Sequence, residues 1–241
     1  MKTLAFVLAI AVAAPASAAW RRVDSPNFIV AGDLNAGDLS AIARKFEVFS
    51  ETLRRVLRSA AVTSPVPTVV IVFPNDEAFT PYKPLYQGRA KAFLAGYAAA
   101  GRDVNYIAMV NEGEATDRVI FHEYTHMVVA NAVARVPVWL NEGLAVWAEE
   151  TEEGERQSWA EQTIAGQELF TLEQLSNSFI QLPIERAEVA YAQGYLAVRA
   201  LIDEYGTRKI PALLGNLASR GGRVATTALL AATLLLATAQ Y

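Results

Sequence analysis

The apolar positions in the first half of the chain form two short continuous runs and one helical stripe. Residues 28–31 (Phe-Ile-Val-Ala) and 68–73 (Thr-Val-Val-Ile-Val-Phe) follow prolines and are typical of interior strands. Between them, residues 38–60 place apolar side chains at helical spacing with charged side chains in between, which predicts an amphipathic helix. The stripe consists of Leu39, Ile42, Phe46, Phe49, Leu53, Val56 and Leu57.

A less regular stretch follows these elements. Residues 75–103 contain two prolines and three glycines, so we expect loop, a short helix and a weak strand there. Residues 104–110 (Val-Asn-Tyr-Ile-Ala-Met-Val) alternate enough to predict a further strand just before the helical part of the chain.

The second half of the chain has helical periodicity. Thr116 is a suitable N-cap for a helix whose circumference is mostly apolar, which predicts that this helix is buried. Pro137 ends that helix and favours a second one over 138–150. A β-containing half (19–115) followed by a helical half (116–222) predicts an α+β fold with a cleft between the halves. Further helices are expected at 157–166, 171–177, 186–205 and 207–219.

The beginning of the chain has the pattern of an export signal. Lys2 precedes an apolar run at 4–14 and small residues at 16–18, so we expect residues 1–18 to be a signal peptide. The remaining residues 19–241 have the size of a single domain, and the chain contains no cysteine. We therefore expect one exported domain, periplasmic or extracellular, that folds without disulfides.

Charge argues against nucleic acid as a partner. The net charge is −4, and Arg54, Arg55 and Arg58 lie on the polar side of a predicted helix, where a solvated face explains them. The acidic run 149–155 is expected to be a helix end and an exposed loop rather than a second cation site.

The last part of the chain, residues 223–241, is strongly apolar. Residues 224–239 carry no charge, but a membrane span needs about 20 apolar residues. This segment is shorter and contains four threonines. We favour a packed helix, on the domain or at a membrane surface, over a tail anchor, so membrane association is the less favoured alternative.

The most informative motif is His122-Glu-Tyr-Thr-His126, which contains both histidines of the chain. Residues four apart share one face of a helix, so both imidazoles can point at one Zn²⁺. Glu123 can then reach a water bound to that metal. In the absence of a metal, the same residues would be two histidines at the polar edge of an amphipathic helix.

Glu142 is the candidate third ligand. Helices joined by a short connection pack antiparallel, so Glu142, near the start of the second helix, can face the histidines. Two histidines and a carboxylate leave a position for water, which is the pattern of a catalytic zinc. Alternatively, Glu142 serves the helix dipole. Gly143 suggests a close backbone approach, with the metal-bearing helix as a candidate, and Asn141 is a candidate partner for a histidine's second nitrogen.

These segments resemble the peptidase MA-like zincins, a gluzincin group of bacterial and often exported proteins. The two metal motifs are the most specific part of the resemblance, which covers most of residues 19–241. It is carried by residues 122–126, 137–147, Trp20, 25–33, 190–196 and 201–206. The resemblance implies a zincin-like fold, in which a small mixed sheet packs on the helical half with the active-site cleft between them. It also implies one zinc held by His122, His126 and Glu142, with Glu123 as the general base.

The resemblance has further implications for substrate binding. It implies a peptide or protein substrate that pairs with an edge strand, either 104–110 or a weak strand near 91–97. An ordinary internal strand is the alternative for 104–110. It also places Tyr191 and Tyr195 near the site as candidate oxyanion donors, and we prefer Tyr191 because Ala-Tyr-Ala-Gln better resembles the family pattern. Either tyrosine would otherwise be a core residue.

The sequence thus predicts a zinc-dependent peptidase. One alternative is a catalytically silent zincin-fold binding module of the bacterial envelope. Another is a structural protein with an accidental motif. The sequence predicts no particular oligomeric state.

Overall fold

The computed structural model describes residues 20–57, 64–86, 89–90, 94–133, 135–150, 152, 154–177 and 179–219. The expected signal peptide at 1–18 and the apolar segment at 223–241 lie outside these residues. None of the helices in the described part has the length and hydropathy of a membrane span.

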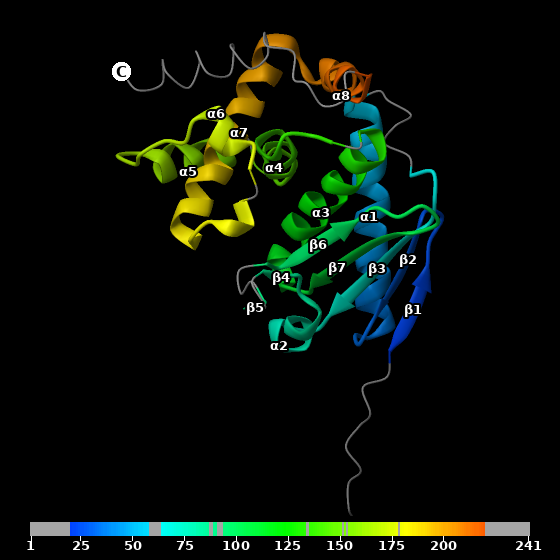
Figure 1. Cartoon of the computed structure of the whole chain (residues 1–241). Helices are drawn as coiled ribbons and strands as arrows, with labels where there is room; N and C mark the ends of the chain where they lie inside the picture. The colour runs from blue at the N-terminus through cyan, green and yellow to red at the C-terminus, as the bar shows by residue number, and fades with distance from the viewer. Residues whose placement is uncertain are drawn as a thin grey trace, which may run out of the picture.

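A mixed sheet in the first half and a mainly helical remainder give the protein the expected α+β architecture (Figure 1). The strands are β1 (Arg21–Asp24), β2 (Phe28–Gly32), β3 (Thr68–Phe73), β4 (Leu85–Tyr86), β5 (Arg89–Ala90), β6 (Gly96–Ala99) and β7 (Asn105–Val110). The α-helices are α1 (Ala36–Leu57), α2 (Asp76–Phe79), α3 (Thr116–Ala132), α4 (Val138–Ala148), α5 (Glu155–Ile164), α6 (Leu172–Leu175), α7 (Ile184–Tyr205) and α8 (Ile210–Ser219). Short 3₁₀ turns lie at Thr80–Tyr82, Gly113–Ala115, Phe179–Gln181 and Thr207–Lys209.

The five-stranded sheet has the order β1-β2-β3-β7-β6. Strands β2, β3 and β7 are parallel, whereas β1 and β6 pair antiparallel at the two edges. Because β7 lies between β3 and β6, the prediction that 104–110 could be the edge strand is wrong, and its alternative, an internal strand, is confirmed. The edge strand next to α3 is β6, which corresponds to the weak strand expected near 91–97.

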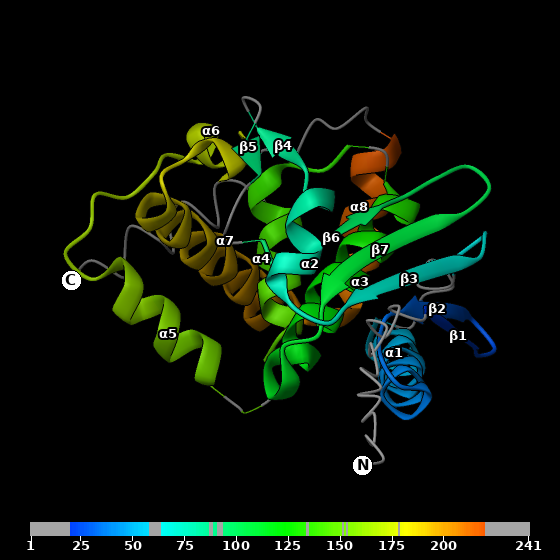
Figure 2. The same cartoon turned by 90° about the horizontal axis from the view of Figure 1, so that it is seen from below.

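The main core lies between one face of this sheet and helices α1 and α3, which cover it in both views (Figures 1 and 2). Val30, Val70, Ile107 and Met109 alternate with side chains of the other face, as β-strand geometry requires, and all four are buried in one cluster with the apolar stripe of α1. The opposite face packs a smaller cluster against α2, formed by Phe73, Phe79, Ala108 and Val110.

Element boundaries differ from the predictions in small ways. Helix α3 begins at Thr116 with Ala115 as its N-cap, so the expectation that Thr116 caps the helix is wrong by one residue. The Thr116 hydroxyl instead donates to Asn111 Oδ1 in the preceding loop. The helix expected at 207–219 is a 3₁₀ turn followed by α8.

Strand β1 and the two-residue strands β4 and β5 are absent from the predictions. Strand β1 is short and mostly exposed, and its sequence Arg-Arg-Val-Asp lacks the apolar alternation of a buried strand.

Candidate metal centre and cleft

Two adjacent helices bring three metal-ligating side chains to one point. His122 and His126 lie one turn apart on α3, and Glu142 lies near the start of α4, which packs against α3. The two histidine Nε2 atoms are 3.0 Å apart. Glu142 Oε2 lies 3.3 Å from Nε2 of His126 and 3.6 Å from Nε2 of His122. The three side chains are mostly buried and have the donor atoms and spacing to hold a metal ion.

This spacing can be compared with that of a metal site. Ligand atoms in a tetrahedral zinc site, with bonds of about 2.0–2.1 Å, lie about 3.3 Å from one another. The separations of 3.0, 3.3 and 3.6 Å between the three donor atoms are centred on that value. The residues therefore fit a tetrahedral divalent ion without rearrangement of the helices.

The electrostatics of the site also favour a cation. Burial lowers the pKa of His122, but hydrogen bonds to Glu142 and Glu149 outweigh burial and hold that pKa well above its ordinary value. For His126, burial again lowers the pKa and the charge of Glu142 raises it beyond that loss. Burial favours the neutral form of Glu142, yet the two histidines hold its pKa well below the usual range. Three carboxylates, including Glu123, thus surround two imidazoles, and the excess negative charge suits a metal ion.

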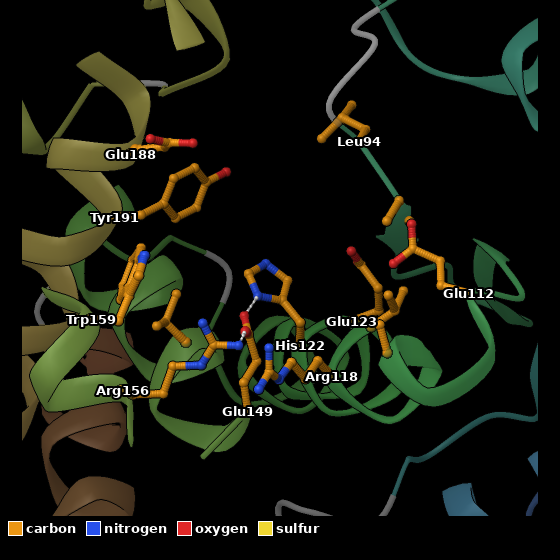
Figure 3. Close-up of a pocket in the computed structure, with 15 residues that line it drawn as sticks. Leu94, Glu112, Arg118, His122, Glu123, Glu149, Arg156, Trp159, Glu188 and Tyr191 are labelled. Atoms are coloured by element: carbon orange, nitrogen blue, oxygen red, sulfur yellow. Dashed lines mark hydrogen bonds and ion pairs between the residues drawn. The ribbon is translucent and has the colours of Figure 1, made fainter. Parts of the chain in front are cut away.

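A chain of polar contacts orients one of the two histidines. His122 Nδ1 lies 2.7 Å from Glu149 Oε1, and the other oxygen of Glu149 lies 2.6 Å from Arg156 Nη2 (Figure 3). A carboxylate at Nδ1 fixes the proton there and leaves the Nε2 lone pair free for a metal. His126 Nδ1 has no partner among the described residues. Asn141 lines the cleft, but the prediction that it holds a histidine nitrogen is wrong.

Glu149 is the site residue that the sequence analysis missed. It begins the acidic run 149–155, which was expected to be a helix end and an exposed loop. The residue does cap the end of α4, but its side chain is only 14% exposed because it faces His122. The sequence does indicate where Glu149 faces: it lies seven residues, or two helical turns, after Glu142 and therefore on the same face of the helix.

Glu123 lies where a catalytic base is needed. It is 6% exposed, and its Oε2 atom has no hydrogen-bond partner in the described part of the chain. Burial raises its pKa above the usual range, while the two histidines oppose that shift. Strand β6 passes directly over this side chain, since a Cβ added at Gly96 would lie 2.9 Å from Glu123 Cγ. Glycine at this edge-strand position therefore allows the close approach of strand and carboxylate.

The two candidate tyrosines on α7 have different surroundings. Tyr191 faces the cleft, with its ring 6.4 Å from that of His122 and packed edge-on against Phe179 (Figure 3). Burial, reinforced by Glu142 and other carboxylates, raises its pKa well above the ordinary value, so its phenol keeps the proton it needs to donate. Tyr195 is fully buried in a cluster with Val146 and lines neither cavity of the cleft.

Gly143 makes a close approach to a helix other than the expected one. A Cβ at Gly143 would lie 2.2 Å from the carbonyl oxygen of Gly194 on α7. The prediction that Gly143 packs against the metal-bearing helix is therefore wrong. Because Gly143 follows Glu142, and Gly194 lies one turn after Tyr191, this crossing sets the position of Glu142 relative to Tyr191.

Two adjoining cavities flank His122, Glu123 and Tyr191. The first, with a volume of about 380 Å³, extends towards α5 and the start of α7 and carries charged side chains on its walls (Figure 3). The second, of about 450 Å³, extends along the end of α3, where its lining includes Val129, Val133 and Phe179 beside the residues of the metal centre. Both volumes are in the range of ligand-binding pockets.

Gly96 of the edge strand β6 lines both cavities. A family model described as the Peptidase MA superfamily matches residues 92–234, more than half of the chain. This range includes β6, β7 and every residue of the candidate metal centre. The search of curated proteins found no match. The chain therefore belongs to the Peptidase MA superfamily, a group of peptidases that is typically metal-dependent.

Proposed function

We propose that this protein is a zinc-dependent peptidase of the gluzincin type, in which His122, His126 and Glu142 hold one zinc ion. The observation that supports this most strongly is the triangle of donor atoms 3.0–3.6 Å apart, with the unpaired Oε2 of Glu123 beside it. Two imidazoles and one carboxylate form the donor set of catalytic zinc sites, and the adjoining cavities leave room for water and substrate.

The chemistry follows from the groups around this centre. A zinc ion bound there supplies a Lewis acid that lowers the pKa of water and polarises a carbonyl group. Glu123 accepts the proton of the attacking water at its free Oε2 and passes it to the nitrogen of the leaving amine. Its raised pKa suits both steps, because the group must accept and then release a proton.

Tyr191 serves as a donor to the developing oxyanion. Its ring lies across the cleft from His122 and its phenol stays protonated. A preorganised hydrogen bond at this position stabilises charge that forms only in the transition state. The edge strand β6, immediately above Glu123, aligns an extended peptide by backbone pairing.

Two substitutions test the assignment. Glu123→Gln should leave the zinc content intact and remove hydrolysis, because it deletes the base but no ligand. His126→Ala should lose both zinc and hydrolysis. Zinc content is measured by elemental analysis, and hydrolysis by mass spectrometry of a mixed peptide library with and without chelator. Retained hydrolysis in Glu123→Gln would remove Glu123 from the mechanism. One bound zinc without cleavage by the unmodified protein would favour a silent zincin-fold binding module.

We also propose that the protein acts outside the cytoplasm, as the signal-like pattern of residues 1–18 suggests. Expression of the full-length chain should yield a product that begins near residue 19. N-terminal sequencing of that product checks this, and an intact N-terminus on the active protein would contradict it.

A further inference from the structure

We propose that the cavity between Glu123 and the start of α7 selects a basic side chain, lysine or arginine, in the residue beside the cleaved bond. The proposal rests on the peptidase function above. It concerns the first of the two cavities, whose volume is about 380 Å³. Glu123 is nine-tenths buried and its side chain points into this cavity, as Figure 3 shows. Its Oε2 atom has no hydrogen-bond partner among the described residues. A substrate side chain in the cavity therefore belongs to a residue at the reacting bond.

The free charges that face this cavity are negative. Glu112, in the loop before α3, and Glu188, in the second turn of α7, line opposite walls of the cavity, as Figure 3 shows. Both side chains are exposed, and neither has a hydrogen-bond or ion-pair partner within the described residues. A cation placed between them would therefore meet two carboxylates that have no ion-pair partner among the described residues.

The two arginines of the cavity are already paired. Arg118 forms an ion pair with Glu155, and Arg156 forms one with Glu149, which in turn contacts His122. An acidic side chain would have to displace these internal partners and would also meet Glu112 and Glu188. The charge pattern of the walls thus favours basic residues over acidic ones.

The remaining walls suit the long stem of such a side chain. Leu94, Val119, Val146 and Trp159 provide apolar surface in the same cavity. Lysine and arginine bury their aliphatic stems on apolar surface while the charged end reaches a polar group. Among its lining residues, the second cavity has no charged side chain besides Glu123 and the three candidate ligands, so it offers no comparable pair of free carboxylates.

Cleavage profiling followed by a matched peptide pair tests this. In a peptide library, lysine and arginine should be enriched at one of the two positions that flank the cleaved bond. For peptides with arginine or norleucine at that position, the ratio of kcat/KM values should fall about two- to fivefold in Glu188→Gln and in Glu112→Gln, the range expected for an exposed ion pair. The ratio should also fall with added salt. Glu204→Gln removes the same charge at the distant end of α7 and should keep the ratio.

The outcomes separate this inference from the peptidase proposal. Cleavage without a basic preference, or an unchanged ratio in both cavity variants, overturns the inference and leaves the peptidase function standing. If no library peptide is cleaved, the peptidase proposal fails. The remaining part of the inference, that the cavity binds a basic side chain, is then judged by calorimetry with Glu123→Gln and blocked hexapeptides that carry a central arginine or norleucine. The inference is supported if the arginine peptide binds more tightly than the norleucine peptide and if adding Glu188→Gln weakens that binding. Equal binding of the two peptides overturns the inference.

Discussion

The floor and the wall of the cleft are built in different ways. The floor, which we define as His122, Glu123, His126 and Glu142, comes from two consecutive helices. The donor atoms of its two histidines and Glu142 lie within 3.6 Å of one another. The wall, which we define as the cleft-facing side chains of α5 and α7, comes from more distant parts of the sequence. The floor has the candidate metal ligands and the candidate base, whereas the wall has a phenol, an aromatic surface and an unpaired carboxylate.

The two regions are joined by specific contacts. The chain from Arg156 through Glu149 to His122 connects the wall with the floor by charge, and the Gly143–Gly194 crossing connects them by packing. If this division is right, floor variants should abolish hydrolysis of every substrate, and variants of the wall or of its connections should have smaller, graded effects.

The largest effect of a wall residue should come from Tyr191→Phe. Loss of one oxyanion donor typically lowers kcat by about 100- to 1,000-fold. Zinc content should be unchanged, because the phenol is not one of the three clustered donor groups. Steady-state kinetics with one cleaved peptide checks this, and Tyr195→Phe, at a tyrosine that lines neither cavity, is the matched control. Equal kcat values for Tyr191→Phe and the unmodified protein would make Tyr191 a packing residue.

The charged connection should have an intermediate effect. Glu149→Gln weakens the hold on His122 Nδ1, and loss of such an outer partner typically weakens metal binding by about 10- to 100-fold. Competition with a zinc chelator measures the affinity. Glu150→Gln is the control, because the carboxylate of Glu150 pairs with Arg199 and not with a histidine. Equal zinc affinity in both variants would show that Glu149 does not position the ligand.

The packed connection should have the smallest of these effects on the site and a clear effect on stability. The Cβ of Gly143→Ala would lie 2.2 Å from Gly194 O, so α4 and α7 must separate. Such overpacking typically lowers the free energy of unfolding by about 1–3 kcal/mol. Denaturant titration measures this free energy of unfolding. Gly215→Ala on α8 meets no atom within 4 Å and should be neutral or stabilising, since alanine is the better helix former. If Gly143→Ala lowers the free energy of unfolding no more than Gly215→Ala does, the helices α4 and α7 do not cross tightly at Gly143.

The same division explains what the sequence could predict. The floor was predicted because His122, His126 and Glu142 lie on neighbouring helices, where periodicity and a short connection fix their relation. Helix α1 was predicted because its apolar stripe is complete. Strand β1 was missed because most of its side chains are polar. The edge position of β6 depends on which strands pair, and the local sequence pattern does not specify strand pairing.

The wall and its charged connection to the floor could not be predicted, because their contacts join residues that lie far apart in the sequence. Glu149 contacts a histidine 27 residues earlier in the chain, and its acidic neighbours gave it the pattern of an exposed run. Arg156, Trp159 and Glu188 meet only because α5 packs on α7, and amphipathic patterns do not state which helices pair. Only Tyr191 was anticipated, and that came from family resemblance rather than from spacing.

The most direct test of the account is the zinc content of the purified protein beside that of Glu142→Ala. Glu142 lies 3.3 Å and 3.6 Å from the two histidine nitrogens, so its carboxylate completes the donor set. Elemental analysis after dialysis should find one zinc per chain in the unmodified protein and a strongly reduced content in the variant. An unmodified protein without zinc, or a variant that retains a full equivalent, would contradict the proposed metal centre.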